Sequence, residues 1–184
     1  MKPTLAPRDL GLVQVYTGTG KGKTSAAIGA GVRAIGHGLT VHMIQFLKGE
    51  GGLALSGEIR TLKLIPQFTV EQFGPCHLLR SNTITEGDRR SVNRGMDRTR
   101  EVLAEGHYDL VILDEINVIL QLGFVPLADV LLALQEKASR TEVILTGRGA
   151  PKQLINHADL VSRIEAVKHP FVDRGLQARR GIEF

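Results

Sequence analysis

The feature that most constrains this chain is a glycine-rich stretch that lies between an apolar run and a run of small residues. The stretch reads Thr17-Gly18-Thr19-Gly20-Lys21-Gly22-Lys23-Thr24-Ser25 and lies between residues 12–16 and residues 26–30. A strand, a glycine-rich loop and a helix in this order are typical of a phosphate-binding P-loop. The glycines let backbone N–H groups turn inward around an anion, and the helix start adds unpaired N–H groups and the positive end of a dipole. The stretch therefore predicts that a phosphate chain binds here.

Two side chains of this loop have predicted partners in a bound nucleotide. Lys23 would lie on the outer phosphates, and Thr24 would offer its hydroxyl to Mg²⁺. The match departs from the usual pattern at its first glycine, which is Thr17 here, while a second lysine, Lys21, and further glycines compensate. An ordinary glycine-rich turn is the alternative, and the flanking residues argue against it. The loop predicts phosphate binding without saying which reaction follows.

The length and composition of the chain are typical of one globular domain. At 184 residues with 42% apolar residues, it is long enough to bury a core. We expect a flexible arm over residues 1–10 and a single P-loop α/β domain over residues 11–184. The net charge of +4 is too weak to indicate nucleic acid, and two tyrosines with no tryptophan provide few stacking platforms. Small anions such as nucleotides are therefore the expected ligands, with no nucleic acid among the partners.

Cysteine usage and the N-terminus predict where the protein works. The one cysteine, Cys76, excludes a disulfide framework and a zinc site built on paired cysteines, and it is typical of a reducing cytosol. We favour an incidental role for Cys76 over one as a nucleophile. The N-terminus lacks the apolar segment of a signal peptide, and no apolar run reaches the roughly 20 residues that span a bilayer. We therefore expect a cytoplasmic protein with no membrane partner.

Strand and helix patterns alternate along the rest of the chain. This alternation predicts a P-loop NTPase-like (RecA-like) α/β fold, in which helices cover both faces of a mainly parallel sheet. Residues 62–65 and 68–73 supply one or two strands, and residues 47–52 and 74–85 are expected loops. The other expected strands are residues 12–16, 40–46, 108–115, 142–146 and 160–167, the last at an edge, and the expected helices are residues 23–35, 55–61, 86–106, 126–138 and 151–156.

A second strong signal is an apolar strand that ends in two acidic residues, Asp114 and Glu115. This is a Walker B pattern, in which one carboxylate holds Mg²⁺ directly or through water while the other positions a ligand. A helix cap or a pair of surface acids after a buried strand is the alternative. The P-loop in the same chain favours the metal site.

Two segments that carry arginines have a functional and a structural interpretation. Arg148 follows the predicted strand 142–146, so it is either a phosphate contact at the ligand-binding edge of the sheet or a loop arginine paired with a nearby acid. Helix 86–106 carries arginines and acids on its outer faces. We interpret it as a solvated helix with internal ion pairs, with a basic surface for an anionic partner as the alternative. Its narrow apolar face comprises Val92, Met96, Thr99 and Leu103.

The residues by themselves leave three classes of reaction open. A P-loop serves small-molecule kinases, RecA-type ATPases, and enzymes that transfer the adenosyl end of ATP. Helix 86–106 could serve as the arginine-bearing lid of a kinase, whereas a ring-forming ATPase would normally be longer than this chain. A thymidine-kinase-like enzyme would need a cysteine zinc site, which one cysteine cannot supply.

Beyond these local signals, the chain resembles the P-loop corrinoid adenosyltransferases, also called ATP:cob(I)alamin or cob(I)yrinic acid a,c-diamide adenosyltransferases. The resemblance extends from about Leu12 to Phe184 and includes the threonine that opens the loop and the extra lysine. Each matching segment is short, but their order and spacing together are specific. The segments are YTGTGKGKTS (16–25), RAIGHG (33–38), QFLKG (45–49), VILDEI (111–116), ILTGRG (144–149), ADLV (158–161), VKHPF (167–171) and QARRGIEF (177–184).

The resemblance implies a reaction and a set of site residues. Co(I) of a reduced corrinoid would attack C5′ of ATP and inorganic triphosphate would leave, while the protein aligns the reactants and neutralises the leaving group. Lys21 and Lys23 would be the catalytic residues. Thr24 and Glu115 would hold Mg²⁺, with Asp114 nearby. ATP would be bound by Gly18, Thr19, Gly20, Lys21, Gly22, Lys23, Thr24, Ser25 and Arg148.

The resemblance also implies partners, and it leaves one departure to explain. A homodimer and a flavoprotein reductase are implied, and a P-loop nucleotide kinase or ATPase remains the alternative function. Some family members carry a Phe and a Trp, two residues apart, that displace the lower cobalt ligand. Residues 73–79 contain no tryptophan here, and His77 and Leu78 fall near those positions. Either this loop displaces the ligand differently or the corrinoid lacks it; a solvated His77 is favoured over a cobalt ligand.

Overall fold

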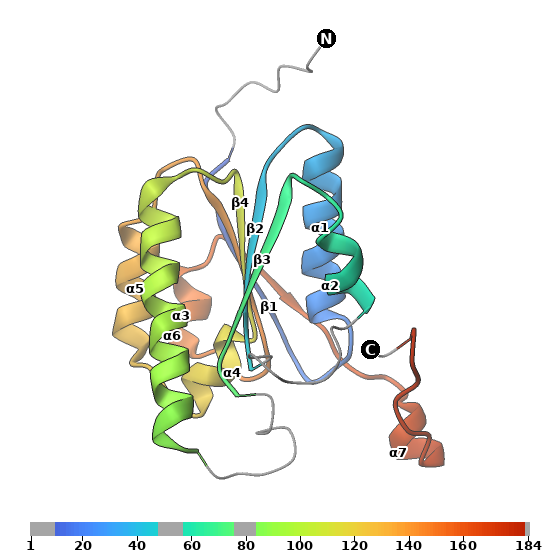
Figure 1. The fold of residues 1–184 in the computed structure, drawn as a ribbon. Coiled ribbons are helices and arrows are strands. Elements are labelled where there is room, and N and C mark those ends of the chain that lie inside the picture. Colours follow the sequence, from blue (N-terminus) through green and yellow to red (C-terminus); the bar gives the residue numbers. More distant parts are fainter. Residues whose placement is uncertain (1–9, 48–56, 76–83, 183–184) are drawn as a thin grey trace.

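The computed structural model describes residues 10–47, 57–75 and 84–182, and its centre is a parallel sheet (Figure 1). Within these ranges, six strands lie in the order β3-β2-β4-β5-β1-β6, and every neighbouring pair is parallel. The expected parallel sheet is therefore confirmed. The strands are β1 (Val13–Thr17), β2 (Val41–Phe46), β3 (Phe68–Phe73), β4 (Leu110–Asp114), β5 (Glu142–Thr146) and β6 (Leu160–Arg163).

Some of the predictions fall on residues outside the described ranges. These are the arm over residues 1–10, apart from Leu10, and most of the loops 47–52 and 74–85. Cys76, His77 and Leu78 also lie outside the described ranges. Their roles, including the question of the lower cobalt ligand, therefore stay predictions.

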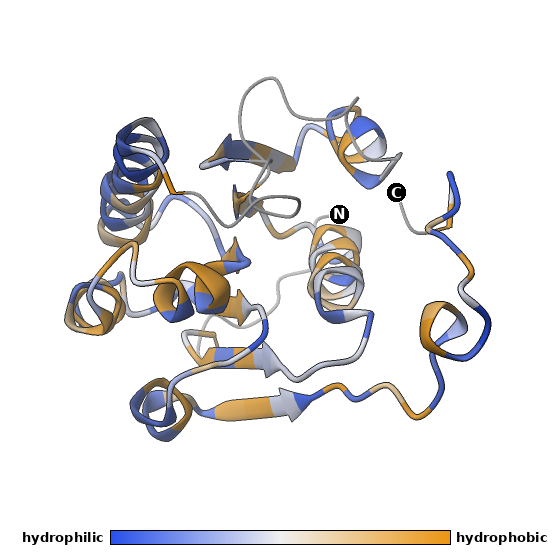
Figure 2. Ribbon diagram, turned by 90° about the horizontal axis from the view of Figure 1, so that it is seen from below, coloured by the Kyte–Doolittle hydropathy of each residue, from blue (hydrophilic) through white to orange (hydrophobic). Residues whose placement is uncertain are grey.

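Helices cover both faces of the sheet, as expected, and Figures 1 and 2 show the two layers. Ala27 of α1 and Ile59 of α2 belong to the apolar core on one face. Leu103 of α3 and Ile119 of α4 belong to a larger core on the other face, to which α5 and α6 also contribute. The helix α7 lies apart from both layers. The helices are α1 (Lys23–Gly36), α2 (Gly57–Leu62), α3 (Glu86–Glu105), α4 (Ile116–Gln121), α5 (Leu127–Gln135), α6 (Lys152–His157) and α7 (Pro170–Arg174).

The burial of each strand follows its place in the sheet. All six residues of β2 are buried, because the strand lies inside the sheet with helices over both faces. All four residues of β6 are exposed, which agrees with the edge position predicted for it. The strand predicted over residues 160–167 is too long, however. After Arg163 the chain leaves the sheet and packs against the P-loop. There the Ile164 N–H donates to the carbonyl oxygen of Thr17, and the Ile164 carbonyl oxygen accepts from the Gly20 N–H.

Two other predicted segments are also corrected by the structure. The strand proposed over residues 62–65 is absent, because Leu62 is buried as the last residue of α2 and Leu64 is 82% exposed in the turn that follows. Helix α5 ends at Gln135 rather than at residue 138. Helix α4 was not expected, because its six residues are mostly apolar and too few to show the spacing of a helix.

The long helix α3 starts at a capping box and packs through its narrow apolar face. The Thr85 side chain accepts a hydrogen bond from the backbone N–H of Asp88, whose carboxylate accepts one from the Thr85 N–H. Gly95 is needed for close packing, because a Cβ there would lie 2.7 Å from the ring of Phe46. The four residues of the predicted apolar face, Val92, Met96, Thr99 and Leu103, are all buried.

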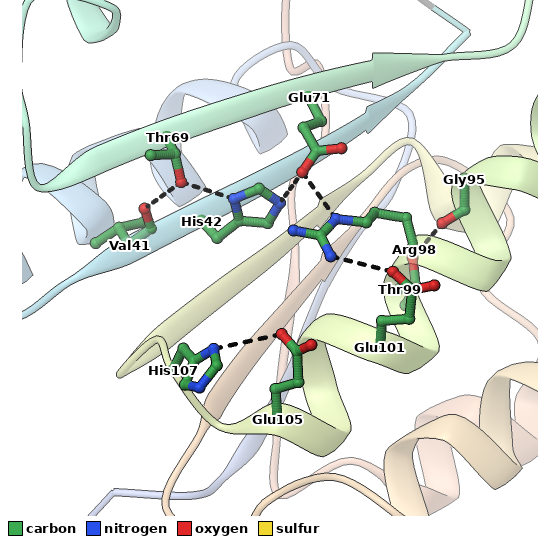
Figure 3. A network of polar contacts seen from close by, with 10 residues as sticks. All are labelled: Val41, His42, Thr69, Glu71, Gly95, Arg98, Thr99, Glu101, Glu105 and His107. Atoms are coloured by element: carbon green, nitrogen blue, oxygen red, sulfur yellow. Dashed lines mark hydrogen bonds and ion pairs between the residues drawn. The ribbon is translucent and has the colours of Figure 1, made fainter.

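Charged residues of α3 form ion pairs within the helix and with its neighbours. Arg98 lies 2.9 Å from Glu71 of β3 and 3.1 Å from Glu101 (Figure 3). Arg100 lies 2.7 Å from Asp97 and contacts α5 as well. The interpretation of this segment as a solvated helix with internal ion pairs is confirmed. Arg98 and Arg100 in addition fix the helix against the sheet and α5.

Candidate nucleotide site

The P-loop connects β1 to α1, and it needs glycine both where the backbone has a positive φ angle and where another part of the chain packs closely against it. Gly18 and Gly22 have φ angles of 104° and 119°, which favour glycine. Gly18 and Gly20 also lie against residues 164–166, because a Cβ at Gly20 would come 2.6 Å from the carbonyl carbon of Glu165. Nothing lies within 4 Å of the position that a Cβ would take at Gly22. Gly22 therefore serves the turn into α1, whereas Gly20 makes room for the chain that leaves β6.

A cavity of about 920 Å³ opens above this loop, at the carboxyl edge of the sheet. It brings together most of the predicted site residues, from Gly20 to Ser25 with Glu115 and Arg148. Among the described residues, Gly18, Thr19 and Asp114 do not line it. The remaining lining residues are Ile28, Gly29, Leu47, Gly57, Glu58, Val118, His169, Gly181 and Ile182.

Lys23 is folded back over the loop and is only 7% exposed. Its Nζ donates hydrogen bonds to the carbonyl oxygens of Gly18, at 2.9 Å, and of Gly20, at 2.6 Å. Burial lowers the pKa of Lys23, while Glu115 and Asp114 raise it and Arg148 lowers it. An ammonium group with three N–H donors has one donor left after these two bonds. Lys23 is therefore placed to meet an anion in the cavity.

Asp114 lies behind the loop and is completely buried. Its Oδ1 accepts hydrogen bonds from the hydroxyls of Thr24, at 2.8 Å, and Thr146, at 2.7 Å. Its Oδ2 accepts one from Nε2 of Gln45, at 2.8 Å. Both oxygens are thus occupied by donors, so Asp114 orients the Thr24 hydroxyl and is not a surface acid. The structural alternative for this acid pair does not hold for Asp114.

Glu115 lines the cavity next to Asp114 and has a strained backbone. Its φ angle is 63°, which is unusual for a residue other than glycine, and strain of this kind often marks functional sites. The N–H of Glu115 donates to Oγ1 of Thr146 at 3.0 Å. Glu115 precedes the first residue of α4, but its side chain makes no capping hydrogen bond. Its carboxylate therefore does not serve the helix as a cap, and it borders the space above Thr24.

Arg148 lies in the turn after β5, where it is exposed and borders the cavity. The turn is fixed by Gly147, with a φ angle of 128°, whose carbonyl oxygen accepts a hydrogen bond from Nδ2 of Asn117 at 3.2 Å. Within the ranges that the structure describes, no acidic side chain forms an ion pair with Arg148. The ion pair considered for Arg148 is thus not found in this part of the chain, and a contact to an anionic ligand stays a prediction.

The C-terminal segment completes the wall of the cavity, which the sequence patterns did not predict. His169, at the start of α7, and residues 181–182 border the space above the loop. Nζ of Lys21 donates to the carbonyl oxygen of Ile182 at 3.2 Å. Lys21 is exposed, unlike Lys23, and is turned towards this segment. The two lysines that were expected to act together therefore have different surroundings.

Sequence reasoning gave no separate role to Gln45 or Thr146, although both bond to Asp114. A signal was present, because each is a polar residue near the carboxyl end of a mostly apolar strand. A buried polar side chain is costly unless it is hydrogen-bonded. Such residues near the carboxyl end of a strand are therefore candidates for supporting a site.

A P-loop backed by a buried acid at the end of a neighbouring strand, beneath an open cavity, defines a P-loop nucleotide-binding protein. The family model described as "ATP:corrinoid adenosyltransferase BtuR/CobO/CobP" matches residues 9–184, and the chain belongs to this family. The resemblance seen in the sequence segments is thereby confirmed.

Curated relatives agree with the family model over nearly the whole chain. The corrinoid adenosyltransferase of Escherichia coli K12 is 35% identical over 179 residues, covering 97% of this chain and 88% of the relative. The corrinoid adenosyltransferase of Salmonella typhimurium is 34% identical with the same coverage. That of Pseudomonas aeruginosa is 33% identical and covers 95% of this chain and 84% of the relative.

Solved structures provide only a remote likeness. A DNA replication initiation factor aligns with a TM-score of 0.40 and 13% identity, over 94% of this chain and 48% of that one. DnaA from Aquifex aeolicus aligns with a TM-score of 0.36 and 18% identity, over 95% of this chain and 50% of that one. This chain spans about half the length of each. No helix in the described part of the chain is long and apolar enough to cross a membrane.

Proposed function

We propose that this chain transfers the 5′-deoxyadenosyl group of ATP to the Co(I) of a reduced corrinoid and releases inorganic triphosphate. The observation that carries the proposal is the match to the ATP:corrinoid adenosyltransferase family over residues 9–184, which includes the whole P-loop and both acids. The site itself supports binding of a phosphate chain. The family match identifies the second reactant as a corrinoid, and it disfavours a nucleotide kinase or ATPase.

The reaction needs alignment and charge neutralisation more than acid–base chemistry. The electron pair of Co(I) forms the bond to C5′, the bond from C5′ to the phosphate oxygen breaks, and its electrons leave with the triphosphate. No proton is transferred, so no protein base is required. Lys23 and Lys21 border the cavity and, in this proposal, neutralise the leaving triphosphate. The loop N–H groups and the start of α1 add to this effect.

Mg²⁺ is the proposed metal ion, and the residues present fit it. Oγ1 of Thr24 uses its proton in the bond to Asp114, which leaves its lone pairs for a cation. The Glu115 carboxylate borders the same space, and oxygen ligands suit Mg²⁺. No group of three or more His, Cys, Asp and Glu side chains that could hold a metal ion occurs among the described residues, so the proposed ligands are Thr24 and Glu115 together with the phosphates. When bound, Mg²⁺ would neutralise charge on the triphosphate; Thr24 and Glu115 would hold it, with Asp114 behind Thr24.

The other proposed nucleotide contacts differ in how directly the geometry supports them. Gly20, Gly22 and Ser25 border the cavity, and so does Arg148. Gly18 and Thr19 do not border it, and Gly18 instead binds Lys23 through its carbonyl oxygen. In this proposal Gly18 and Thr19 therefore act on the phosphates through the shape of the loop.

A homodimer, a flavoprotein reductase and a cytoplasmic location complete the proposal. Exposed apolar side chains on β6 and α7 suit contact with a second copy of the chain; they are Leu160, Val161, Phe171 and Val172. A reductant is required because the cobalt must reach Co(I) before transfer. The single cysteine suits a reducing compartment. Residues 11–184 are proposed to act as one domain.

The test is anaerobic incubation of the purified protein with Mg·ATP and a chemically reduced Co(I) corrinoid. The loss of Co(I) absorbance and the identity of the phosphate product are measured together. We expect an adenosylcorrinoid and triphosphate, with the rate lost in Lys23→Ala and kept in Lys152→Ala, whose side chain is exposed at the start of α6. Release of ADP without a Co–C product would contradict the proposal and favour a P-loop kinase or ATPase.

A further inference from the structure

A row of three polar side chains crosses the sheet and ends at the buried acid of the nucleotide site. Gln45 of β2 pairs in register with Gln72 of β3 on one side and with Asp114 of β4 on the other. Nε2 of Gln72 donates to Oε1 of Gln45 at 2.8 Å, and Nε2 of Gln45 donates to Oδ2 of Asp114 at 2.8 Å. Residues that pair directly across strands point to the same face of a sheet, so the row forms from the register alone.

The direction of the hydrogen bonds in this row follows from the charge at its end. An ionised carboxylate only accepts hydrogen bonds, so Gln45 must turn its NH₂ group towards Asp114. The amide oxygen of Gln45 then faces β3, where Gln72 must present its own NH₂ group. Each amide is therefore held in one of its two orientations. Gln72 fixes the amide of Gln45, and Gln45 in turn fixes the carboxylate of Asp114.

Gln45 does not touch the cavity, so any role in the reaction passes through Asp114. It is completely buried and is not among the residues that line the space above the P-loop. With Oδ2 held by Gln45, the other oxygen of Asp114 faces the Thr24 hydroxyl. An apolar residue at position 45 would leave Oδ2 buried without this donor, and the carboxylate would be held through Oδ1 alone, by Thr24 and Thr146.

We propose that Gln45 is a positioning residue for adenosyl transfer, which holds Asp114 so that the lone pairs of Thr24 Oγ1 face the metal ion of the bound nucleotide. Gln72 supports it by fixing the orientation of its amide. The inference rests on the proposed Mg²⁺ site. Partners of this kind, one step behind the metal ligands, typically change metal affinity or activity by about 10- to 100-fold when they are replaced.

The competing explanation is that the row only stabilises the sheet. In that case its loss would lower the stability of the protein and weaken ATP binding whether or not a metal ion is present. A positioning role predicts a different pattern, in which metal binding weakens and metal-free ATP binding does not. The distinction can be measured without any corrinoid.

The experiment compares Gln45→Met with Gln67→Met, a matched control at an exposed glutamine just before β3. Binding of Mn²⁺ to the protein with ATP is followed by electron paramagnetic resonance, and binding of ATP in EDTA is measured separately. For Gln45→Met we expect Mn²⁺ affinity to fall about 10-fold or more, with metal-free ATP affinity within about twofold of the unmodified protein. The control should match the unmodified protein in both.

A second variant, Gln72→Met, keeps the donor on Gln45 and removes only what fixes its orientation. We expect a smaller loss of Mn²⁺ affinity than in Gln45→Met. The double variant should bind Mn²⁺ no more weakly than Gln45→Met, because both changes act through the same contact.

If Gln45→Met fails to fold, the result for Gln72→Met decides, and an unchanged Mn²⁺ affinity in that variant would overturn the inference. Equal losses in metal-bound and metal-free ATP affinity would also overturn it. Absence of Mn²⁺ binding by the unmodified protein with ATP would reject the metal site and the inference together, whereas normal binding that Gln45→Met leaves unchanged would reject the inference alone.

Discussion

The hydroxyl of Thr24 lies 2.8 Å from Oδ1 of Asp114, and this hydrogen bond joins the start of α1 to the end of β4. β1 and β4 are not neighbours, because β5 lies between them. Thr146 at the end of β5 bonds to the same carboxylate oxygen at 2.7 Å. The three elements therefore meet at one buried charge, and the position of the P-loop relative to the sheet depends on it.

Replacing Asp114 by Asn should lower the stability of the protein. Three donors point at the carboxylate, and an amide would turn its own NH₂ group towards at least one of them. A buried donor left without an acceptor costs about 1–3 kcal/mol. We expect the free energy of unfolding, measured with urea in EDTA, to fall by that amount. Asp97→Asn, on the exposed side of α3, is the control, and an equal effect in both variants would contradict this account.

Replacing Gly20 by Ala should disturb the loop through the segment that follows β6. The added Cβ would come 2.6 Å from the Glu165 carbonyl carbon and 2.9 Å from the Ala166 nitrogen, both of which are backbone atoms. We expect a loss of roughly 1–3 kcal/mol in unfolding free energy and faster hydrogen exchange at residues 164–166. Gly36→Ala meets no atom within 4 Å, so it should be neutral or stabilising. Unchanged exchange at residues 164–166 in Gly20→Ala would refute the prediction.

Replacing Arg148 by Ala should reduce turnover without affecting stability. The side chain is exposed at the cavity and has no ion pair with any described residue, so the fold does not depend on it. Loss of one donor to a developing anion typically costs about 100-fold in rate. We expect kcat/KM for ATP to fall by about that factor, with unfolding free energy unchanged within about 0.5 kcal/mol. Arg140→Ala, at another exposed arginine, serves as the control; a rate equal to that of the unmodified protein would exclude Arg148 from the site.

His42 should make the stability of the protein depend on pH in the acidic range. It is 1% exposed, stacks on Tyr108 with ring centroids 4.7 Å apart, and faces Glu71 of β3 and Arg98 of α3 (Figure 3). Burial lowers the pKa of His42 to about 4, with Glu71 raising it and Arg98 lowering it. Below pH 6.5 the unfolded chain gains a proton that the folded chain does not bind until about pH 4. Stability should therefore fall across this window, by up to about 3 kcal/mol.

The measurement for His42 is urea unfolding between pH 7 and pH 4 for the unmodified protein and for His42→Phe, which keeps a ring against Tyr108. The stability difference between them should shift in favour of the variant by up to about 3 kcal/mol as the pH falls. His107→Phe is the matched control, because His107 is exposed. A difference that stays constant over this range would show that His42 does not titrate as described.

The order of strands and helices could be predicted because its signals are local. The P-loop, the buried run of β2 and the acids at the end of β4 can each be recognised from a few consecutive residues. The boundary at Glu115 was harder, because apolar residues continue on both sides and the break is a single backbone angle of 63°. The edge position of β6 was also predictable, since its pattern is more polar than that of the inner strands.

The hydrogen bonds that hold Asp114 in place could not be predicted, because they depend on which strands are neighbours. Gln45 meets Asp114 and Gln72 only because β2 lies between β3 and β4 in that register. No pattern within one strand contains this information. The same holds for Ile182, whose carbonyl oxygen meets Lys21 from the far end of the chain.

The contact between the P-loop and residues 164–166 also bears on how fast the protein can fold. Among the described strands, β1 pairs with β5 and β6, and these pairs join distant residues, such as Val13 with Val143 and Gln14 with Leu160. The Gly20 N–H finds its acceptor on Ile164, beyond β6. The final shape of the P-loop therefore depends on pairings between parts of the sequence that are far apart, and such non-local pairings are typical of slow folding steps.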